Sequence, residues 1–208
     1  MAAKTKSRGK KVANKDDEAL KCITPVGRAC FVHVWEPYAF KANDGKSKEP
    51  SYRIVLVFDE DTDLQDVKRI VSNAIKKKWG VDEGKRLIKR GKMTMPWRDA
   101  SDYEEYGEPF DDDGAIMISL SSRSAPGVVD ARAKPIMKQQ DFYAGCLARA
   151  SVYAHAYDTL GNMGVTLLLN NVQKAGDGDK LSGRADPTEE FDPLVEDDED
   201  DELADMLG

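Results

Sequence analysis

One segment places an arginine and two tyrosines at spacings suited to binding a nucleic-acid strand. From Cys146 to Tyr157 small apolar residues alternate with a second set that includes Arg149, Tyr153 and Tyr157. In a β-strand, side chains on one face recur about every 6.6 Å. Rings at that spacing can stack on successive bases, and an arginine can pair with a phosphate. The pattern predicts a binding strand, with a solvated face whose tyrosines pack beneath a loop as the open alternative.

Further aromatic and basic side chains could extend this surface. The apolar segment that starts at Gly27 puts Phe31, His33 and Trp35 on one predicted face and leads into a lysine-containing loop. Arginines near strand ends and a Trp-Arg pair in a predicted loop could line a positive groove with Arg149. The predicted DNA-binding residues are therefore Arg149, Tyr153, Tyr157, Trp35, Tyr38, Phe40, Arg53, Trp97, Arg98, Arg123, Arg132 and Lys134.

The segments that must position these residues are mostly strands. Apolar, β-branched stretches follow Gly27, Ser51, Gly114, Gly145 and Gly161, and turn residues separate them. Parallel βαβ units would need regularly alternating helices, which the order of segments does not provide. We therefore expect a mainly β fold with one main helix: an OB-fold-like five-stranded barrel with insertions.

The clearest helix begins near Thr62, which we expect to be its N-cap. Apolar residues recur from Leu64 to Ile75 at helical spacing and predict one buried stripe. Gly80 suits the C-cap, and the run 76–78 of three lysines fits the negative end of the helix dipole. Residues 81–113 are expected to form a short basic helix or turn and then a long loop. The helix follows the second predicted strand, whereas an OB-fold usually has it after the third.

The formal net charge of −7 conceals three different parts of the chain. Residues 1–21 carry 7 basic and 3 acidic side chains, and residues 186–208 carry 12 acidic and no basic ones. The intervening residues are nearly neutral. The expected organisation is a flexible basic arm (1–21), an OB-fold single-stranded DNA-binding domain (22–185) and a disordered acidic tail (186–208).

The tail combines acids with a few apolar residues. Leu203, Met206 and Leu207 follow the acidic run. Acids can steer such a segment to a basic pocket while the apolar residues anchor it. We expect these three residues to bind a partner, or the tail to fold back on the protein's own cationic groove as a mimic of DNA.

Several classes of protein are excluded or disfavoured. No run of about 18 apolar residues exists, so no membrane-spanning helix is expected. No apolar stretch follows the basic residues at the N-terminus, so no secretory signal is expected. Three cysteines without CxxC spacing favour a reducing, cytoplasmic compartment. Two histidines and the absence of a recognisable catalytic motif disfavour an enzyme, and no cofactor or metal is expected. Asp111–Asp113 could be imagined in a two-metal nuclease site, but three successive aspartates before a glycine more simply form a solvated turn.

Several stretches resemble a known protein family. PWRDASDYEEYG, SSRSAPGVVDARAKPI, DFYAGCLARASVYAHAYD and GNMGVTLLLNNVQKAGDGDKLSGR are similar to the phage single-stranded DNA-binding proteins, formerly a phage domain of unknown function. The resemblance covers roughly residues 24–184. It implies an OB-fold, sequence-independent coating and protection of single-stranded DNA in replication or recombination, and no cofactor. It also implies that the tail recruits phage or host replication proteins such as a polymerase, helicase or primase. This tail ends in Leu-Gly, whereas such tails commonly end in Phe.

Other functions stay open at this point. The first alternative is an RNA-binding or strand-annealing protein, since an OB surface does not by itself exclude a 2′-hydroxyl. The others are a metal-dependent nuclease and an assembly adaptor that acts through its tail alone. We expect a monomer or weak homo-oligomer in the cytoplasm, that of the host if a phage encodes the chain.

Overall fold

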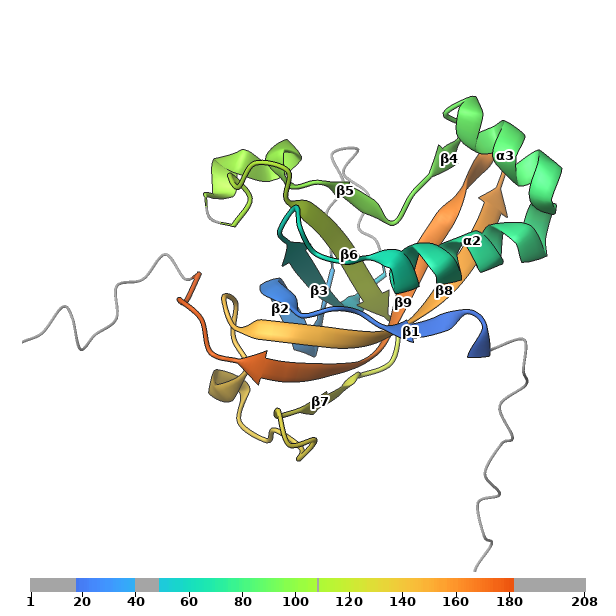
Figure 1. Ribbon diagram of the computed structural model, residues 1–208. Coiled ribbons are helices and arrows are strands. Elements are labelled where there is room, and N and C mark those ends of the chain that lie inside the picture. Colours follow the sequence, from blue (N-terminus) through green and yellow to red (C-terminus); the bar gives the residue numbers. More distant parts are fainter. Residues whose placement is uncertain (1–17, 40–48, 108, 182–208) are drawn as a thin grey trace, which may run out of the picture.

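Five strands close into a barrel in the computed structural model, which describes residues 18–39, 49–107 and 109–181. Hydrogen-bonded neighbours run in the order β8-β2-β3-β6-β9, and β9 pairs back with β8 (Figure 1). The β6–β9 pairing is parallel and the others are antiparallel. This circuit confirms the predicted OB-like barrel. Its strands are β2 (Gly27–Tyr38), β3 (Ser51–Phe58), β6 (Ile116–Ser122), β8 (Leu147–Thr159) and β9 (Asn162–Gly176).

Shorter elements extend the barrel. The two- and three-residue strands β4 (Met93–Thr94) and β5 (Trp97–Asp99) pair with β9 and β6, so the long loop expected within 81–113 is wrong. Strands this short, on either side of Pro96, show no periodicity that a sequence pattern could reveal. The remaining short elements are β1 (Lys21–Ile23) beside β8, β7 (Gly127–Val129) beside β9, and the 3₁₀ helices η1 (Ala100–Tyr106) and η2 (Gln139–Asp141).

Two helices lie between β3 and β6. Helix α2 (Gln65–Trp79) packs against β1, β8 and β9, and α3 (Val81–Lys89) packs against α2. The predicted stripe is confirmed: Leu64, Val67, Ile70, Val71, Ala74 and Ile75 are all buried in the main core. The sequence predicted one main helix followed by a short basic helix or turn, and α3 is that short helix.

The predicted C-cap of α2 is confirmed, whereas its predicted N-cap is wrong. Leu64, and not Thr62, is the N-cap, and the Asp63 carboxylate accepts the Gln65 backbone N–H at 2.8 Å. This bond to the N–H two residues on is an Asx turn, which leads the chain into the helix. Gly80 is the C-cap as predicted, with φ of 78°, a conformation that favours glycine.

The apolar interior has two parts. The main core fills the barrel with the inward side chains of every long strand and the buried face of α2. A smaller cluster lies on the outer side of β3 and β6 and consists of Cys30, Val55, Val57, Ala100, Phe110, Ala115 and Met117. The segment that follows β5 therefore covers one end of the barrel's outer surface.

Irregularities in two strands decide which side chains point outward. In β8 the predicted alternation holds, with Ala148, Ala150, Val152 and Ala154 buried. In β2 the register shifts between Cys30 and His33, where Phe31 has φ of 46°, and again between His33 and Tyr38. Trp35 lies within the second shift and is half-buried against the main core, so the expected common face for Phe31, His33 and Trp35 is wrong. Sequence alternation cannot reveal such a bulge in advance.

Most of the predicted arm and all of the predicted tail fall outside the described residues. The expectations for residues 1–17 and 182–208 therefore cannot be compared with the structure, including those for Leu203, Met206 and Leu207. Phe40 lies in the undescribed range 40–48. No helix among the described residues is long and apolar enough to cross a membrane.

Candidate nucleic-acid interface

One row of paired residues crosses the outer face of the barrel. The side of β2, β3, β6, β8 and β9 that points away from the main core is called the outer face below. Paired residues in neighbouring strands point to the same side of a sheet. The successive partners across the five strands are His33, Arg53, Ser121, Leu168 and Tyr153. The row joins two predicted binding residues, Arg53 and Tyr153, that lie 100 positions apart in the sequence.

The β2 end of the row combines stacked rings with positive charge. Tyr38 is 46% exposed, and its ring stacks on that of His33 with centroids 4.5 Å apart. Arg53 lies opposite His33 in the ladder, and its Nε donates to Ser51 Oγ at 2.9 Å. Burial and the Arg53 charge lower the pKa of His33. A neutral imidazole and a phenol ring offer a flat surface to a base, with a guanidinium beside them for a phosphate.

Arg123 follows β6 close to the same end of the barrel. Ser122, the preceding residue, pairs with Tyr52. The Arg123 guanidinium lies 3.4 Å from the Glu49 carboxylate, and both side chains are at least 83% exposed. An ion pair this exposed contributes little stability, so a phosphate can replace Glu49 at small cost.

A second group of predicted residues lines a groove beside β6. Tyr157 and Arg98 both border this groove of about 150 Å³, together with Met117, Ser119 and Thr166. An ideal Cβ on Gly164 would lie 2.6 Å from both Tyr157 Oη and the Thr94 carbonyl oxygen. The absence of a side chain at Gly164 therefore lets Tyr157 lie against β9. The Arg98 guanidinium donates to Tyr103 Oη at 3.2 Å.

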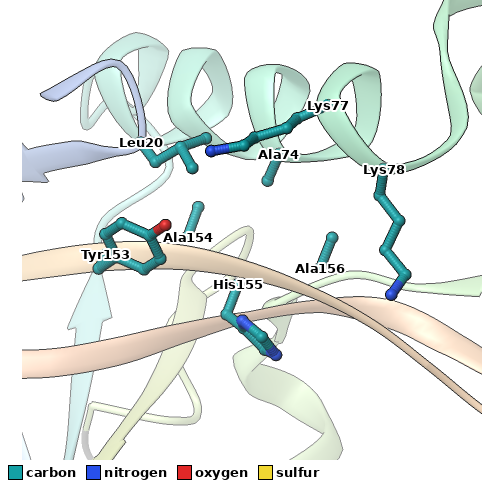
Figure 2. A pocket seen from close by; sticks show the side chains of 8 residues that line it. All are labelled: Leu20, Ala74, Lys77, Lys78, Tyr153, Ala154, His155 and Ala156. Atoms are coloured by element: carbon teal, nitrogen blue, oxygen red, sulfur yellow. The ribbon is translucent and has the colours of Figure 1, made fainter. Parts of the chain in front are cut away.

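Tyr153 is half-buried and packs partly against the main core, and it also lines a pocket between α2 and β8 (Figure 2). Lys77 and Lys78 come from the helix, and Tyr153 and His155 come from the strand. Figure 2 shows Ala154 and Ala156 directed toward the helix and His155 directed away from it. Two lysines beside a half-buried tyrosine give this end of the row the charge that a phosphate backbone needs.

Arg149, Arg132 and Lys134 gather further along β8. Arg149 Nε donates to Gln173 Oε1 at 2.9 Å, and Gln173 Nε2 donates to the Asp130 carbonyl oxygen at 3.0 Å. The Asp130 carboxylate accepts the backbone N–H groups of Arg132 and Lys134 at 2.9 and 2.8 Å. This turn holds both exposed basic residues beside Lys174 in one shallow depression.

The two predicted tryptophans are mainly packing residues. Trp35 and Trp97 are half-buried and pack against the main core. Trp35 Nε1 is buried and has no hydrogen-bond partner among the described residues. Less of each tryptophan ring is therefore left for a ligand. Tyr38 and Arg53 are both neighbours of His33, and Tyr157 and Arg98 line one groove.

An aromatic cluster lies beside the row, and the sequence pattern did not predict that its four rings meet. Phe31, Tyr103, Tyr106 and Phe110 pack together, with Phe31 at 5.4 Å from Tyr106 and 5.7 Å from Phe110 between ring centroids. Phe110 is buried, whereas Phe31 and Tyr106 are 40% and 57% exposed. The spacing of the three rings after β5 was the available signal, but their meeting with Phe31 depends on the β2 bulge.

The acidic run that follows Phe110 and two of the thiols can also be placed in the structure. Asp111, Asp112 and Asp113 are exposed in a turn after Phe110, and the described residues contain no group of three His, Cys, Asp or Glu arranged to hold a metal ion. Burial raises the pKa of Cys30 to about 12 and that of Cys22 to about 11, which keeps both as thiols at neutral pH.

The fold and this face together define a class of protein. OB-fold barrels bind oligonucleotides on the face of their second and third strands and with the loops that flank it. In the present barrel those strands are β3 and β6, which carry Arg53, Ser119 and Ser121 on the outer face. The chain is thus an OB-fold protein with Arg53 on the surface that this fold uses for ligands and the His33–Tyr38 stack on the adjacent strand β2.

Comparison with known proteins identifies the family. The family described as "Enterobacter phage Enc34, ssDNA-binding protein" matches residues 20–204, so this chain belongs to it. A relative from Acyrthosiphon pisum secondary endosymbiont phage 1, called putative protein p50, is 27% identical over 185 residues, which are 85% of this chain and 95% of the relative.

Two solved structures have a similar fold. One is the single-stranded DNA-binding protein from bacteriophage Enc34 in complex with ssDNA, with a TM-score of 0.62 and 16% identity over 79% of this chain and 91% of that one. The other is gp2.5, a single-stranded DNA-binding protein encoded by bacteriophage T7, with a TM-score of 0.50 and 16% identity over 80% and 97% of the two chains. These matches confirm the predicted fold class and the predicted family.

Proposed function

We propose that this protein binds single-stranded DNA without sequence preference along its outer face. The strand would cross the row from the Tyr38–His33 stack, past Arg53, toward Tyr153 and the lysines of α2. Stacking on exposed rings and neutralisation of phosphates would supply the affinity. No hydrogen-bonding site for a particular base is required.

The observation that carries this proposal is the row itself. His33, Arg53, Ser121, Leu168 and Tyr153 are successive partners on the face where OB-folds bind oligonucleotides. Rings at both ends and an arginine between them match what an extended strand offers, namely bases and phosphates in alternation. Membership of the Enc34 family supports the same ligand.

Titration with a fluorescent oligothymidine tests the proposal. At low salt the full chain should bind the oligonucleotide, and affinity should fall steadily as the salt concentration rises. Matched duplex DNA should bind more weakly, since its bases are not available for stacking. Absence of binding to oligothymidine at 20 mM salt or lower would overturn the proposal.

Three further measurements decide between this proposal and the alternatives: RNA binding, strand annealing and DNA cleavage. Equal or tighter binding of the matched RNA oligonucleotide would favour an RNA-binding protein. Faster pairing of complementary strands would favour an annealing protein. Cleavage of labelled DNA in magnesium or manganese would favour a nuclease, and would have to be lost on substitution of Asp111–Asp113.

We further propose a role in phage DNA replication or recombination in the host cytoplasm. The protein would coat and protect single strands, while the acidic residues of the segment 186–208 recruit polymerase, helicase or primase. The order of acids followed by Leu203, Met206 and Leu207 supports this role. Purified replication enzymes should bind the full chain and lose that binding in a chain with all three residues changed to serine, while ssDNA affinity is unchanged.

A further inference from the structure

An apolar groove lies between the two helices, away from the row on the outer face. Its volume is about 360 Å³, and α2, α3 and the chain around β5 line it. Val81 and Ile88, both from α3, are 49% and 45% exposed. Ile75, Met95 and Trp97 provide further apolar surface. The groove offers a place for two or three apolar side chains of a partner segment.

The rim of this groove is positively charged. Lys68 and Lys76 of α2 and Lys85 of α3 line it. Residues 65–92 hold ten Lys or Arg and three Asp or Glu in all. A ligand that combines several acids with a few apolar residues would therefore complement both the rim and the floor.

One segment of this chain has that composition. Residues 196–202 are all acidic, and Leu203, Met206 and Leu207 follow within five positions. The spacing of these three residues resembles one side of a helical turn or a compact extended segment, so they can enter one groove together. The seven acids of the tail complement the lysines at the rim of the groove, and its three apolar side chains complement the apolar floor.

The length of the tail allows this contact. Leu181 is the last described residue and packs on the smaller cluster, on the far side of the barrel from α3 (Figure 1). The chain from there to Leu203 can span about 70 Å when extended. A domain of about 160 residues has a diameter of roughly 40 Å. The tail can therefore reach the groove of its own molecule.

We propose that the α2–α3 groove binds the C-terminal segment 196–208 of the same chain. The acids would lie along Lys68, Lys76 and Lys85, and the apolar residues would enter between Val81 and Ile88. Binding there hides the apolar residues of the tail while leaving the outer face open. This inference extends beyond the proposed function, because it requires no DNA.

Photocrosslinking in the full chain tests the proposal. A benzoylphenylalanine at position 206, activated by light, should crosslink to residues 68–88, as mapped by mass spectrometry. The crosslinks should persist when the protein is saturated with oligothymidine. Crosslinks to β3 or β6 that oligothymidine removes would overturn the proposal, since the tail would then occupy the outer face. Crosslinks mainly between differently isotope-labelled copies would equally overturn the intramolecular contact.

Paired variants separate the groove from general charge. Ile88→Glu and Lys85→Glu should each lower the crosslink yield at residues 68–88 by about tenfold, because each removes a direct partner of the tail. Lys89→Glu makes the same charge change on α3 outside the groove and should leave the yield within about twofold. All three positions are at the surface, and circular dichroism would verify the fold. Equal loss in all three variants would contradict a specific groove.

Discussion

The imidazole of His33 lies almost parallel to the phenol ring of Tyr38, with 4.5 Å between centroids and 17° between planes. Arg53 is the ladder partner of His33 on the adjacent strand. A stack of two rings beside a guanidinium, on the ligand face of an OB barrel, is the most specific feature of the interface.

Removing the Tyr38 ring should weaken DNA binding. Tyr38→Ala is expected to raise the dissociation constant for oligothymidine about 5- to 150-fold, because stacking contributes about 1–3 kcal/mol per base. Tyr38→Phe keeps the ring and should bind nearly as well as the original protein. Fluorescence anisotropy at fixed salt measures both. Comparable losses in the two variants would point to the hydroxyl instead of the ring.

The lowered pKa of His33 should make stability depend on pH. Burial and Arg53 disfavour the protonated ring, so the folded-state pKa lies below the unfolded value of about 6.5. The resulting contribution to stability is fully present above that value and is lost as pH falls through the folded-state pKa. Urea denaturation at pH 7 and pH 5 should show a larger loss for the original protein than for His33→Gln. An identical loss of unfolding free energy in the two proteins would show that His33 does not cause the pH dependence.

Arginines on the outer face should set the salt dependence of binding. Arg53→Gln and Arg98→Gln should each reduce the slope of log affinity against log salt by about 0.7, the value for one single-strand phosphate contact. Arg86→Gln serves as the control, since Arg86 pairs with Glu83 on α3. Its slope should equal that of the original protein. An equal change in all three would indicate a general effect of net charge.

A side chain at Gly164 should disturb the groove that holds Tyr157. The added Cβ would approach Tyr157 Oη and the Thr94 carbonyl oxygen to 2.6 Å. Gly164→Ala should therefore destabilise the protein by about 1–3 kcal/mol and weaken DNA binding. Gly176→Ala, on the same strand, is the control because the nearest atom to its added Cβ, Leu147 Cδ1, would be 3.7 Å away. Denaturation curves of the two variants provide the comparison.

Removal of the acidic tail should tighten DNA binding. Residues 186–208 carry 12 acidic side chains, whose negative charge repels phosphates through space even when the tail lies in the α2–α3 groove. A chain ending at residue 185 should bind oligothymidine several-fold more tightly at about 50 mM salt, with the difference vanishing near 1 M as screening shortens the reach of charge. Unchanged or weaker binding at low salt would reject this repulsion.

Much of the fold was predictable because local patterns specify it. The alternation in β8 and the apolar stripe of α2 each follow from the repeat of their element, and both predictions are confirmed. The order of strands and one main helix indicated the barrel. The two-residue β4 and three-residue β5 could not be predicted, because such short strands form only when a neighbouring strand supplies their hydrogen bonds.

The sequence by itself determined the kinds of side chain available and the alternation in β8 that turns Arg149, Tyr153 and Tyr157 to one side. Only the tertiary structure decided which side chains from distant segments lie next to one another. The β2 bulge places Phe31 against Tyr106, and the successive strand pairings through β6 and β9 align His33 and Arg53 with Tyr153. These relationships depend on register between strands far apart in the chain. Register arises from packing of the whole barrel and has no local signal in the residues themselves.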